Sequence, residues 1–356
     1  MLLMRKPELK DFTLYDKDGW INIPAIASLG CFIIVIIGPR QVGKTYGSIK
    51  YMLDNNINHI YFRRTKEELK AVVDDPDLNP YLKMEQEGYH VGMKKVSTYT
   101  WAIGDLDTES EKIALTNRRG IGMGMMSVSK IRGFSGDKFT DGIYDEFIPE
   151  QIVSKREGEG DAVLNAYTTI NGNRELEGRP PFRLWLLANA NDLFSPVLEA
   201  YALTGVVENL IRTGKEWTIR DGIFVAMPRS EKVIGRRKET ALMKYLGKHG
   251  GGKFYDMAMN NEFSYSDVRL VRPKPIAGYK PYLRMGSYYV WEKNNLDSLY
   301  VCRTRHTHHD AYEDNKDDRV RIALAHPELR LFYLANKITF SDASVLAYFK
   351  RMLKLD

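Results

Sequence analysis

The sequence predicts an α/β protein whose larger part is a doubly wound parallel sheet, and three observations support this fold class. An apolar, β-branched run at 32–37 has the composition of a buried parallel strand. A glycine-containing segment at 38–45 follows it and leads into a stretch that can be helical. From 31 to about 227, strand-like and helix-like runs alternate, as expected for a parallel sheet with helices on both faces.

The segment at 38–45 matches G-x-x-x-x-G-K-[ST], the phosphate-binding loop, and stands where that loop must stand, between a strand and a helix. Its glycines let backbone N–H groups surround phosphate oxygens, and the new helix directs its positive end at them. Lys44 is expected to bridge the β- and γ-phosphates, and the Thr45 hydroxyl to ligate Mg²⁺. The predicted cofactors are ATP and Mg²⁺, and the predicted binding residues are Gly38, Pro39, Arg40, Gln41, Val42, Gly43, Lys44 and Thr45.

The remaining elements of this part follow from the same patterns. Strands are predicted at 32–37, 59–63, 99–103, 112–116, 142–145, 183–188 and 223–227. Helices are predicted at 44–54, 65–72, 149–156, 160–170 and 194–203. Phosphate should lie at the carboxyl ends of these strands.

Length and composition favour two domains of a soluble protein. The 356 residues exceed one typical core, while 44% hydrophobic and 28% charged residues are ordinary. The longest apolar run, Cys31–Ile37, predicts no membrane segment, and the first 18 residues match neither a signal nor a transit peptide. The two cysteines, Cys31 and Cys302, predict no disulfide framework or metal pair. A net charge of +6 mildly favours a polyanionic partner.

The composition changes after Pro228 and predicts three regions. These are an ATPase domain at 1–228, a basic helical linker at 229–255 and a small α+β domain at 256–356. In the last region, Leu283–Trp291 and Leu299–Arg303 are expected to form a hairpin around Asn294-Asn295. Helices are expected at 319–325 and 342–355, the latter with an apolar face.

A second acidic strand is expected to complete the nucleotide site, and Asp145-Glu146 after Ile143-Tyr144 is the best candidate. Asp145 would hold the metal through water, and Glu146 would orient or deprotonate the attacking water. An adjacent glutamate is typical of ATPases rather than GTPases or kinases. The alternative is a strand that ends in two solvated acids. Asn189, at the tip of the next strand, is predicted to sense the γ-phosphate; alternatively it begins a turn.

Basic residues suggest two further roles. Arg174, on a Gly- and Asn-rich loop, fits an arginine supplied to a neighbouring subunit, with an exposed, locally paired arginine as the alternative. Arg40 is expected near the nucleotide or facing a neighbour. The segment 115–138 is predicted to be a flexible basic loop that contacts nucleic-acid backbone, or else a solvated loop. Its candidate nucleic-acid-binding residues are Arg118, Arg119, Lys130 and Arg132.

Taken in order, these motifs resemble the DNA-packaging ATPases of φ29-like podophages, relatives of terminase large subunits and FtsK/HerA-type translocases. The resemblance extends over nearly the whole chain. Its motifs are Gly38–Thr45, Tyr61–Arg64, Ser127-Val128, Asp145–Phe147, Asn173–Glu175, Asn189-Ala190, Lys253–Phe263 and Tyr288–Trp291.

The resemblance implies a P-loop ATPase of the ASCE class followed by an RNase H-like domain that has lost its nuclease. It implies a homopentameric ring at the portal of a procapsid in the host cytoplasm, pumping double-stranded DNA, with a structural RNA left open. It also implies a basic residue acting across the subunit boundary, for which Arg174 and Arg132 are the matches. The chain departs from the pattern at Gly172, where relatives have a second arginine.

Two other functions remain as alternatives. A terminase-like enzyme with a live nuclease would need a metal site in the last region, for which Asp297 and Asp310 are candidates together with His306, His308 and His309. A nucleotide-gated binding protein would hydrolyse little ATP, and Glu146 argues against it.

Overall fold

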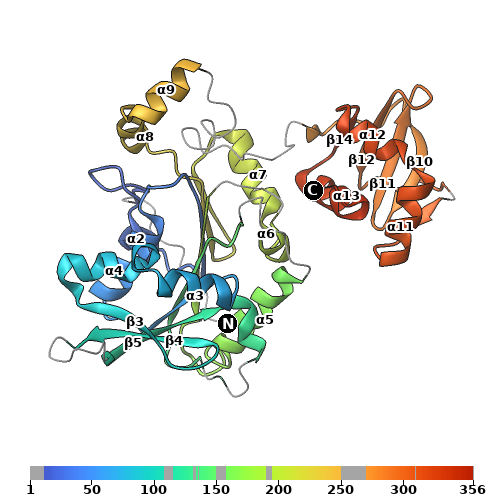
Figure 1. Cartoon of the computed structure of the whole chain (residues 1–356). Helices are drawn as coiled ribbons and strands as arrows, with labels where there is room; N and C mark the ends of the chain where they lie inside the picture. The colour runs from blue at the N-terminus through green and yellow to red at the C-terminus, as the bar shows by residue number, and fades with distance from the viewer. Residues whose placement is uncertain are drawn as a thin grey trace. The chain divides into compact units, whose positions relative to one another are not determined.

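The computed structural model describes residues 12–107, 115–130, 134, 136–149, 158–189, 195–249, 270–308 and 310–355 (Figure 1). The chain divides into two compact units. The first unit comprises residues up to 201 together with 210–264, and the second comprises 202–209 together with 265–356.

The first unit is built on a nine-stranded sheet in the order β3-β4-β5-β2-β6-β7-β1-β9-β8. The six strands from β5 to β9 in this order are parallel, whereas β3, β4 and β8 pair antiparallel at the edges. The strands are β1 (Ile33–Ile37), β2 (His59–Arg63), β3 (Val91–Lys95), β4 (Thr100–Leu106), β5 (Leu115–Gly124), β6 (Asp141–Asp145), β7 (Arg183–Ala188), β8 (Trp217–Arg220) and β9 (Ile223–Ala226). The predicted parallel sheet is therefore confirmed.

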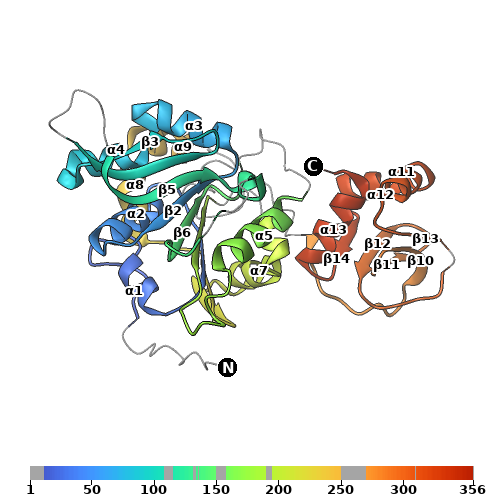
Figure 2. The same ribbon diagram turned by 90° about the horizontal axis from the view of Figure 1, so that it is seen from below.

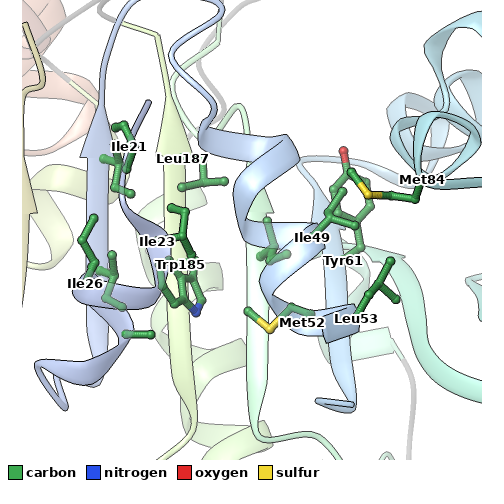
Figure 3. Packing of buried hydrophobic residues seen from close by; sticks show 14 of the residues in the cluster. Ile21, Ile23, Ile26, Ile49, Met52, Leu53, Tyr61, Met84, Trp185 and Leu187 are labelled. Atoms are coloured by element: carbon green, nitrogen blue, oxygen red, sulfur yellow. The ribbon is translucent and has the colours of Figure 1, made fainter. Parts of the chain in front are cut away.

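Helices cover both faces of this sheet, with α2 and α5 on opposite sides (Figures 1 and 2). On the α2 face, Trp185 of β7 and Tyr61 of β2 pack with Ile49 and Met52 in one buried cluster (Figure 3). The helices of the first unit are α1 (Ile23–Ser28), α2 (Lys44–Asp54), α3 (Lys66–Asp74), α4 (Pro80–Met84), α5 (Glu159–Asn171), α6 (Pro196–Ala200), α8 (Glu231–Lys238) and α9 (Ala241–His249). Helix α7 (Thr204–Thr213) begins in the second unit and ends in the first. Short 3-10 turns occur at η1 (Pro76–Leu78) and η3 (Met125–Lys130), and a π turn at η2 (Glu85–Tyr89).

The second unit contains a five-stranded sheet in the order β13-β10-β11-β12-β14. Helix α13 (Ala343–Leu353) presents the predicted apolar face, and its buried residues include Leu346 and Phe349. Phe349 packs against Phe340 with ring centroids 5.1 Å apart. The other elements are β10 (Lys280–Met285), β11 (Tyr288–Lys293), β12 (Ser298–Cys302), β13 (Ala311–Tyr312), β14 (Ile338–Phe340), α11 (Lys316–Ala325) and α12 (Glu328–Leu334).

Several predicted boundaries are wrong in the second unit. The predicted strand 283–291 is two strands, because the chain turns at Gly286, whose φ is +54°. The hairpin at Asn294-Asn295 joins β11 to β12 as expected. The sequence reading missed α12 and the two- and three-residue strands β13 and β14, which are too short to show a period.

The segment 115–138 is not a flexible loop where it is described. Residues 115–124 form β5, a strand paired with β2 and β4, and 125–130 form η3. Its glycines allow close packing rather than flexibility. A Cβ on Gly120 would lie 2.3 Å from the carbonyl oxygen of His59, and one on Gly124 would lie 2.5 Å from the backbone nitrogen of Lys66.

The predicted linker is part of the first unit. Both α8 and α9 are helical as expected, but they belong to the unit that ends at 264. Val233 of α8 is buried in the core cluster of the first sheet, and Arg237 donates to the carbonyl of Arg40 at 3.0 Å. The boundary predicted at 228 therefore falls inside this unit. The predicted helix at 149–156 lies almost wholly outside the described residues. Among the described helices, none is both long and apolar enough to cross a membrane.

Candidate functional site

A cleft of about 960 Å³ lies over the phosphate-binding loop. Gly43, in the left-handed region at φ +90°, turns the chain into α2, whose first residue is Lys44. Gly38 also allows close packing, since a Cβ there would lie 2.7 Å from Pro228 Cγ. The cleft is lined by the loop residues Arg40, Gln41, Gly43, Lys44 and Thr45 and by Asp145, Glu146 and Asn189. These come from the carboxyl ends of neighbouring parallel strands, as predicted.

Lys44 is buried at the base of the cleft. Its ammonium donates to the carbonyls of Gly38 and Pro39, each at 2.8 Å, and to Asn189 Oδ1 at 3.2 Å. Burial lowers the pKa of Lys44 to about 7, against the opposing attraction of Asp145. Asn189 thus lies beside Lys44, the lysine predicted to bind phosphate.

Thr45 and Asp145, one hundred positions apart in the sequence, are in direct contact. Thr45 Oγ1 donates to Asp145 Oδ1 at 2.8 Å. The second carboxylate oxygen accepts from the Tyr61 hydroxyl at 3.0 Å and lies 3.5 Å from an Arg63 nitrogen. Burial raises the pKa of Asp145, while Arg63 opposes that rise. A hydroxyl and a carboxylate oxygen side by side form a donor set suited to Mg²⁺, so these residues fit the predicted metal.

Glu146 follows the end of β6 in a constrained backbone conformation. Its φ of +56° lies in the left-handed region, which is uncommon for a non-glycine residue and typical of functional sites. Its side chain is 52% exposed and forms an ion pair with Arg63 of β2. The candidate base is therefore held by an arginine at the end of the adjacent parallel strand. No role for Arg63 was predicted from the sequence. The available signal was a basic residue at the end of one predicted strand and an acidic residue at the end of another.

A buried ion pair supports this corner of the site. Arg64, the neighbour of Arg63, contacts Glu159 in a bidentate manner, with Nε–Oε1 at 2.7 Å and Nη2–Oε2 at 3.1 Å. The Tyr144 hydroxyl donates to the same carboxylate at 3.1 Å. Because both partners are almost fully buried, removal of one would leave an uncompensated charge. The pair joins the start of α5 to the end of β2.

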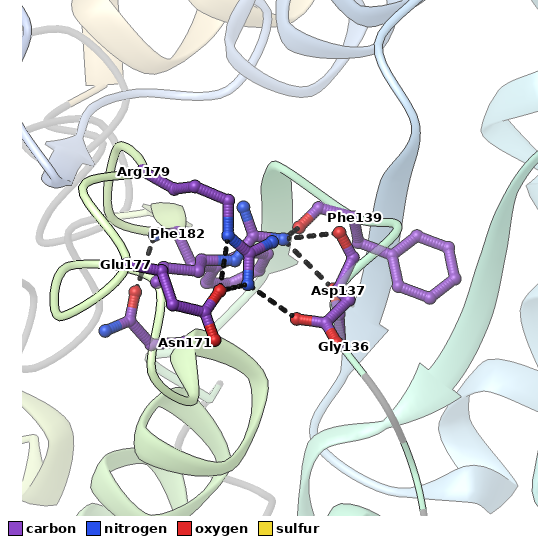
Figure 4. Close-up of polar contacts among 8 residues, drawn as sticks. Gly136, Asp137, Phe139, Asn171, Glu177, Arg179 and Phe182 are labelled. Atoms are coloured by element: carbon purple, nitrogen blue, oxygen red, sulfur yellow. Dashed lines mark hydrogen bonds and ion pairs between the residues drawn. The ribbon is translucent and has the colours of Figure 1, made fainter.

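The structure corrects the prediction for Arg174. This arginine is only 4% exposed, so it is neither presented at the surface of the chain nor the exposed, locally paired arginine of the alternative. One guanidinium nitrogen donates to the carbonyls of Gly136, Asp137 and Phe139 at 3.2, 3.0 and 2.5 Å. These three acceptor residues are labelled in Figure 4. Arg174 therefore holds the segment that leads into β6. The other candidate, Arg132, lies outside the described residues.

The candidate nucleic-acid residues divide into two groups. Arg119 forms an ion pair with Asp105 of β4 and also donates to Asn56 Oδ1 at 2.9 Å, so its guanidinium is engaged within the first unit. Arg118 on β5 and Lys130 at the end of η3 are exposed. Among the described candidates, only Arg118 and Lys130 are exposed as a contact with a phosphate backbone would require.

The second unit contains the residues that were candidate metal ligands under the nuclease alternative. Asp297 Oδ1 lies 3.7 Å from Lys337 Nζ, and His306 contacts the carbonyl of Val290 at 3.0 Å. Asp310 lies on an exposed segment with His308, while His309 is outside the described residues. Over the described part of the chain, no three His, Cys, Asp or Glu side chains form a group able to hold a metal.

The chain is similar to a protein family and to several solved structures. Residues 15–275 match the family model of the podovirus DNA encapsidation protein (Gp16). The packaging motor assembly of bacteriophage Phi-29 has a similar fold, with 19% identity, a TM-score of 0.63, and coverage of 96% of this chain and 100% of that chain. The Phi-28 gp11 DNA packaging motor aligns with 16% identity and a TM-score of 0.58 over 94% of this chain and 97% of that one. No curated protein matches significantly.

Proposed function

The chain belongs to the podovirus DNA encapsidation protein (Gp16) family, and we propose that it hydrolyses ATP in the cleft over its phosphate-binding loop to drive double-stranded DNA into a procapsid. Genome packaging follows from the family. The ATP-driven step is inferred from the site. In this proposal the first unit is an ATPase domain of the ASCE type, because β7 lies between β1 and β6 in the sheet.

The contact between Thr45 and Asp145 carries this proposal. It places the loop hydroxyl against the acidic strand, in a cleft that Lys44 and Glu146 also line. Mg²⁺, when bound, would neutralise phosphate charge there. Lys44 would exchange its loop carbonyls for phosphate oxygens, and Asn189, already bonded to Lys44, would respond to that exchange. Glu146 would orient the attacking water once it leaves Arg63.

The working assembly in this proposal is a homomeric ring, pentameric by resemblance, at the portal of the procapsid in the host cytoplasm. A structural RNA as a further partner stays open. Two candidates remain for the residue supplied across the subunit boundary. The first is Arg132, and the second is Arg40, which lines the cleft. A residue supplied in this way is worth about 10³–10⁵ in rate in related chemistry.

The second unit is proposed to bind nucleic acid without cutting it, as a vestigial RNase H-like domain. Its described acidic residues form no metal-binding group, which disfavours the terminase-like alternative. Incubation of the protein with duplex DNA and Mn²⁺ should therefore leave the DNA intact. Cutting that is lost in Asp297→Ala or Asp310→Ala would restore that alternative.

Steady-state ATP turnover with and without duplex DNA tests the motor. Turnover is expected to rise with DNA and to disappear in Lys44→Ala. If DNA leaves the turnover of the wild-type protein unchanged, a nucleotide-gated binding protein becomes the better description.

A further inference from the structure

A short turn before α1 places a large aromatic side chain at the candidate nucleotide cleft. Trp20 is 38% exposed, although tryptophan is highly buried on average. Its side chain lines the same cleft as Lys44 and Thr45. A Cβ on Gly43 would lie 3.7 Å from Trp20 Cβ and 3.8 Å from its ring atom Cε3. The indole therefore borders the phosphate-binding loop itself.

Hydrogen bonds within the turn fix its shape. The N–H groups of Asp18 and Trp20 both donate to Asp16 Oδ1 at 2.9 Å. The Asp16 N–H in turn donates to the carbonyl of Trp20 at 2.9 Å. The next residue, Ile21, donates to the carbonyl of Val42 at 3.1 Å and ties the turn to the phosphate-binding loop.

Helix α8 holds the turn from outside. Ser230 Oγ donates to the carbonyl of Gly19 at 2.6 Å, and Arg236 donates to the carbonyl of Asp18 at 2.8 Å. The Arg236 guanidinium lies over the indole of Trp20, with Cζ 4.7 Å from the ring centroid, an attractive cation–π arrangement. Trp20 is thus an aromatic surface fixed before any ligand binds, so little conformational entropy is lost on binding.

We propose that Trp20 is the residue on which the base of the bound nucleotide stacks, an assignment that rests on the nucleotide site proposed above. A triphosphate held by Lys44 and Thr45 has its base at its other end, and Trp20 is an aromatic wall of the same cleft. Stacking of a base on an aromatic side chain strengthens binding by roughly 5- to 100-fold.

Equilibrium binding of ATP and of inorganic tripolyphosphate, which has no base, separates stacking from phosphate binding. Trp20→Ala is expected to weaken ATP binding roughly 5- to 100-fold while leaving tripolyphosphate binding unchanged. Trp20→Phe should keep most of the ATP affinity, because it keeps an aromatic face. ATP should also quench tryptophan fluorescence more in the wild type than in Trp20→Phe. Tyr245→Ala is the matched control, since Tyr245 is 61% exposed on α9 and does not line the cleft.

Three results would overturn the assignment. Unchanged ATP affinity in Trp20→Ala would remove Trp20 from the site. Equal weakening of ATP and tripolyphosphate would show that the turn only supports the loop. Failure of the wild type to bind either ligand would overturn the proposed function itself and this assignment with it, and the tripolyphosphate measurement keeps these failures distinct.

Discussion

The two sheets of the protein place their acidic side chains differently. In the first unit, Asp145 and Glu146 end β6 and meet Thr45 and Arg63 at the carboxyl edge of a parallel sheet. In the second unit, β10, β11 and β12 are antiparallel, and Asp297 lies in the turn between β11 and β12 beside Lys337. Parallel strands bring all their carboxyl ends to one edge, whereas antiparallel strands alternate. Strand direction therefore decides whether acids converge.

The largest expected effect distinguishes the two sheets directly. Glu146→Gln should lower ATP turnover by about 10²–10⁴-fold, because the amide cannot accept a proton. ATP binding should persist, since Lys44 and Thr45 are intact. Asp297→Asn, the matched change in the second sheet, should leave turnover unaltered. Measuring ATP turnover and nucleotide binding on both variants tests this difference between the two sheets. An equal loss of turnover in Glu146→Gln and Asp297→Asn would contradict it.

The next largest expected effect concerns Arg174, which supports the segment leading into β6 of the first sheet. Arg174→Ala should lower the free energy of unfolding by about 2–3 kcal/mol, because three carbonyls near β6 lose a charged donor. Chemical denaturation measures this loss. Arg179→Ala, which removes an exposed arginine from the same loop, is the control and should change stability little. Normal stability in Arg174→Ala, together with rescue of its activity by Lys44→Ala subunits in mixed rings, would return it to a role across the subunit boundary.

The ion pair between Arg63 and Glu146 gives a smaller effect. Arg63→Gln should raise the turnover measured without DNA by a few-fold, because the candidate base is released from its ion pair. Arg183→Gln is a matched control, since Arg183 pairs with Asp141 at the amino end of the same sheet. A fall in turnover without a change in ATP binding would show instead that Arg63 supports the active arrangement.

The smallest expected effect concerns the exposed basic residues. Arg118→Ala combined with Lys130→Ala should weaken DNA binding a few-fold for all sequences and reduce its salt dependence. Arg119→Gln should not have this effect, because Arg119 is engaged by Asp105. Titrations at two salt concentrations make the measurement. Equal salt slopes for the double variant and the wild type would assign these residues to an ordinary solvated surface.

Local patterns predicted much of the first unit. The strands 59–63 and 183–188 and the helix 44–54 agree with β2, β7 and α2 at every residue, because each has a strong apolar period or a motif at its start. The pairing of Thr45 with Asp145 was also predictable, since the phosphate-binding loop and the acidic strand have a known order. The glycines of β5 were misread as a flexible loop because the backbones that approach them come from distant segments.

The sequence by itself determined the phosphate-binding loop, the acidic strand after it and the alternation that makes a parallel sheet, since these depend on neighbouring residues. Only the tertiary structure decided which charged side chains are available. Arg63 holds Glu146, Arg174 is buried on three carbonyls, and α8 supports Trp20 at the cleft. The physical reason is that an arginine's role depends on which acceptors surround it, and the packing of remote segments supplies those acceptors.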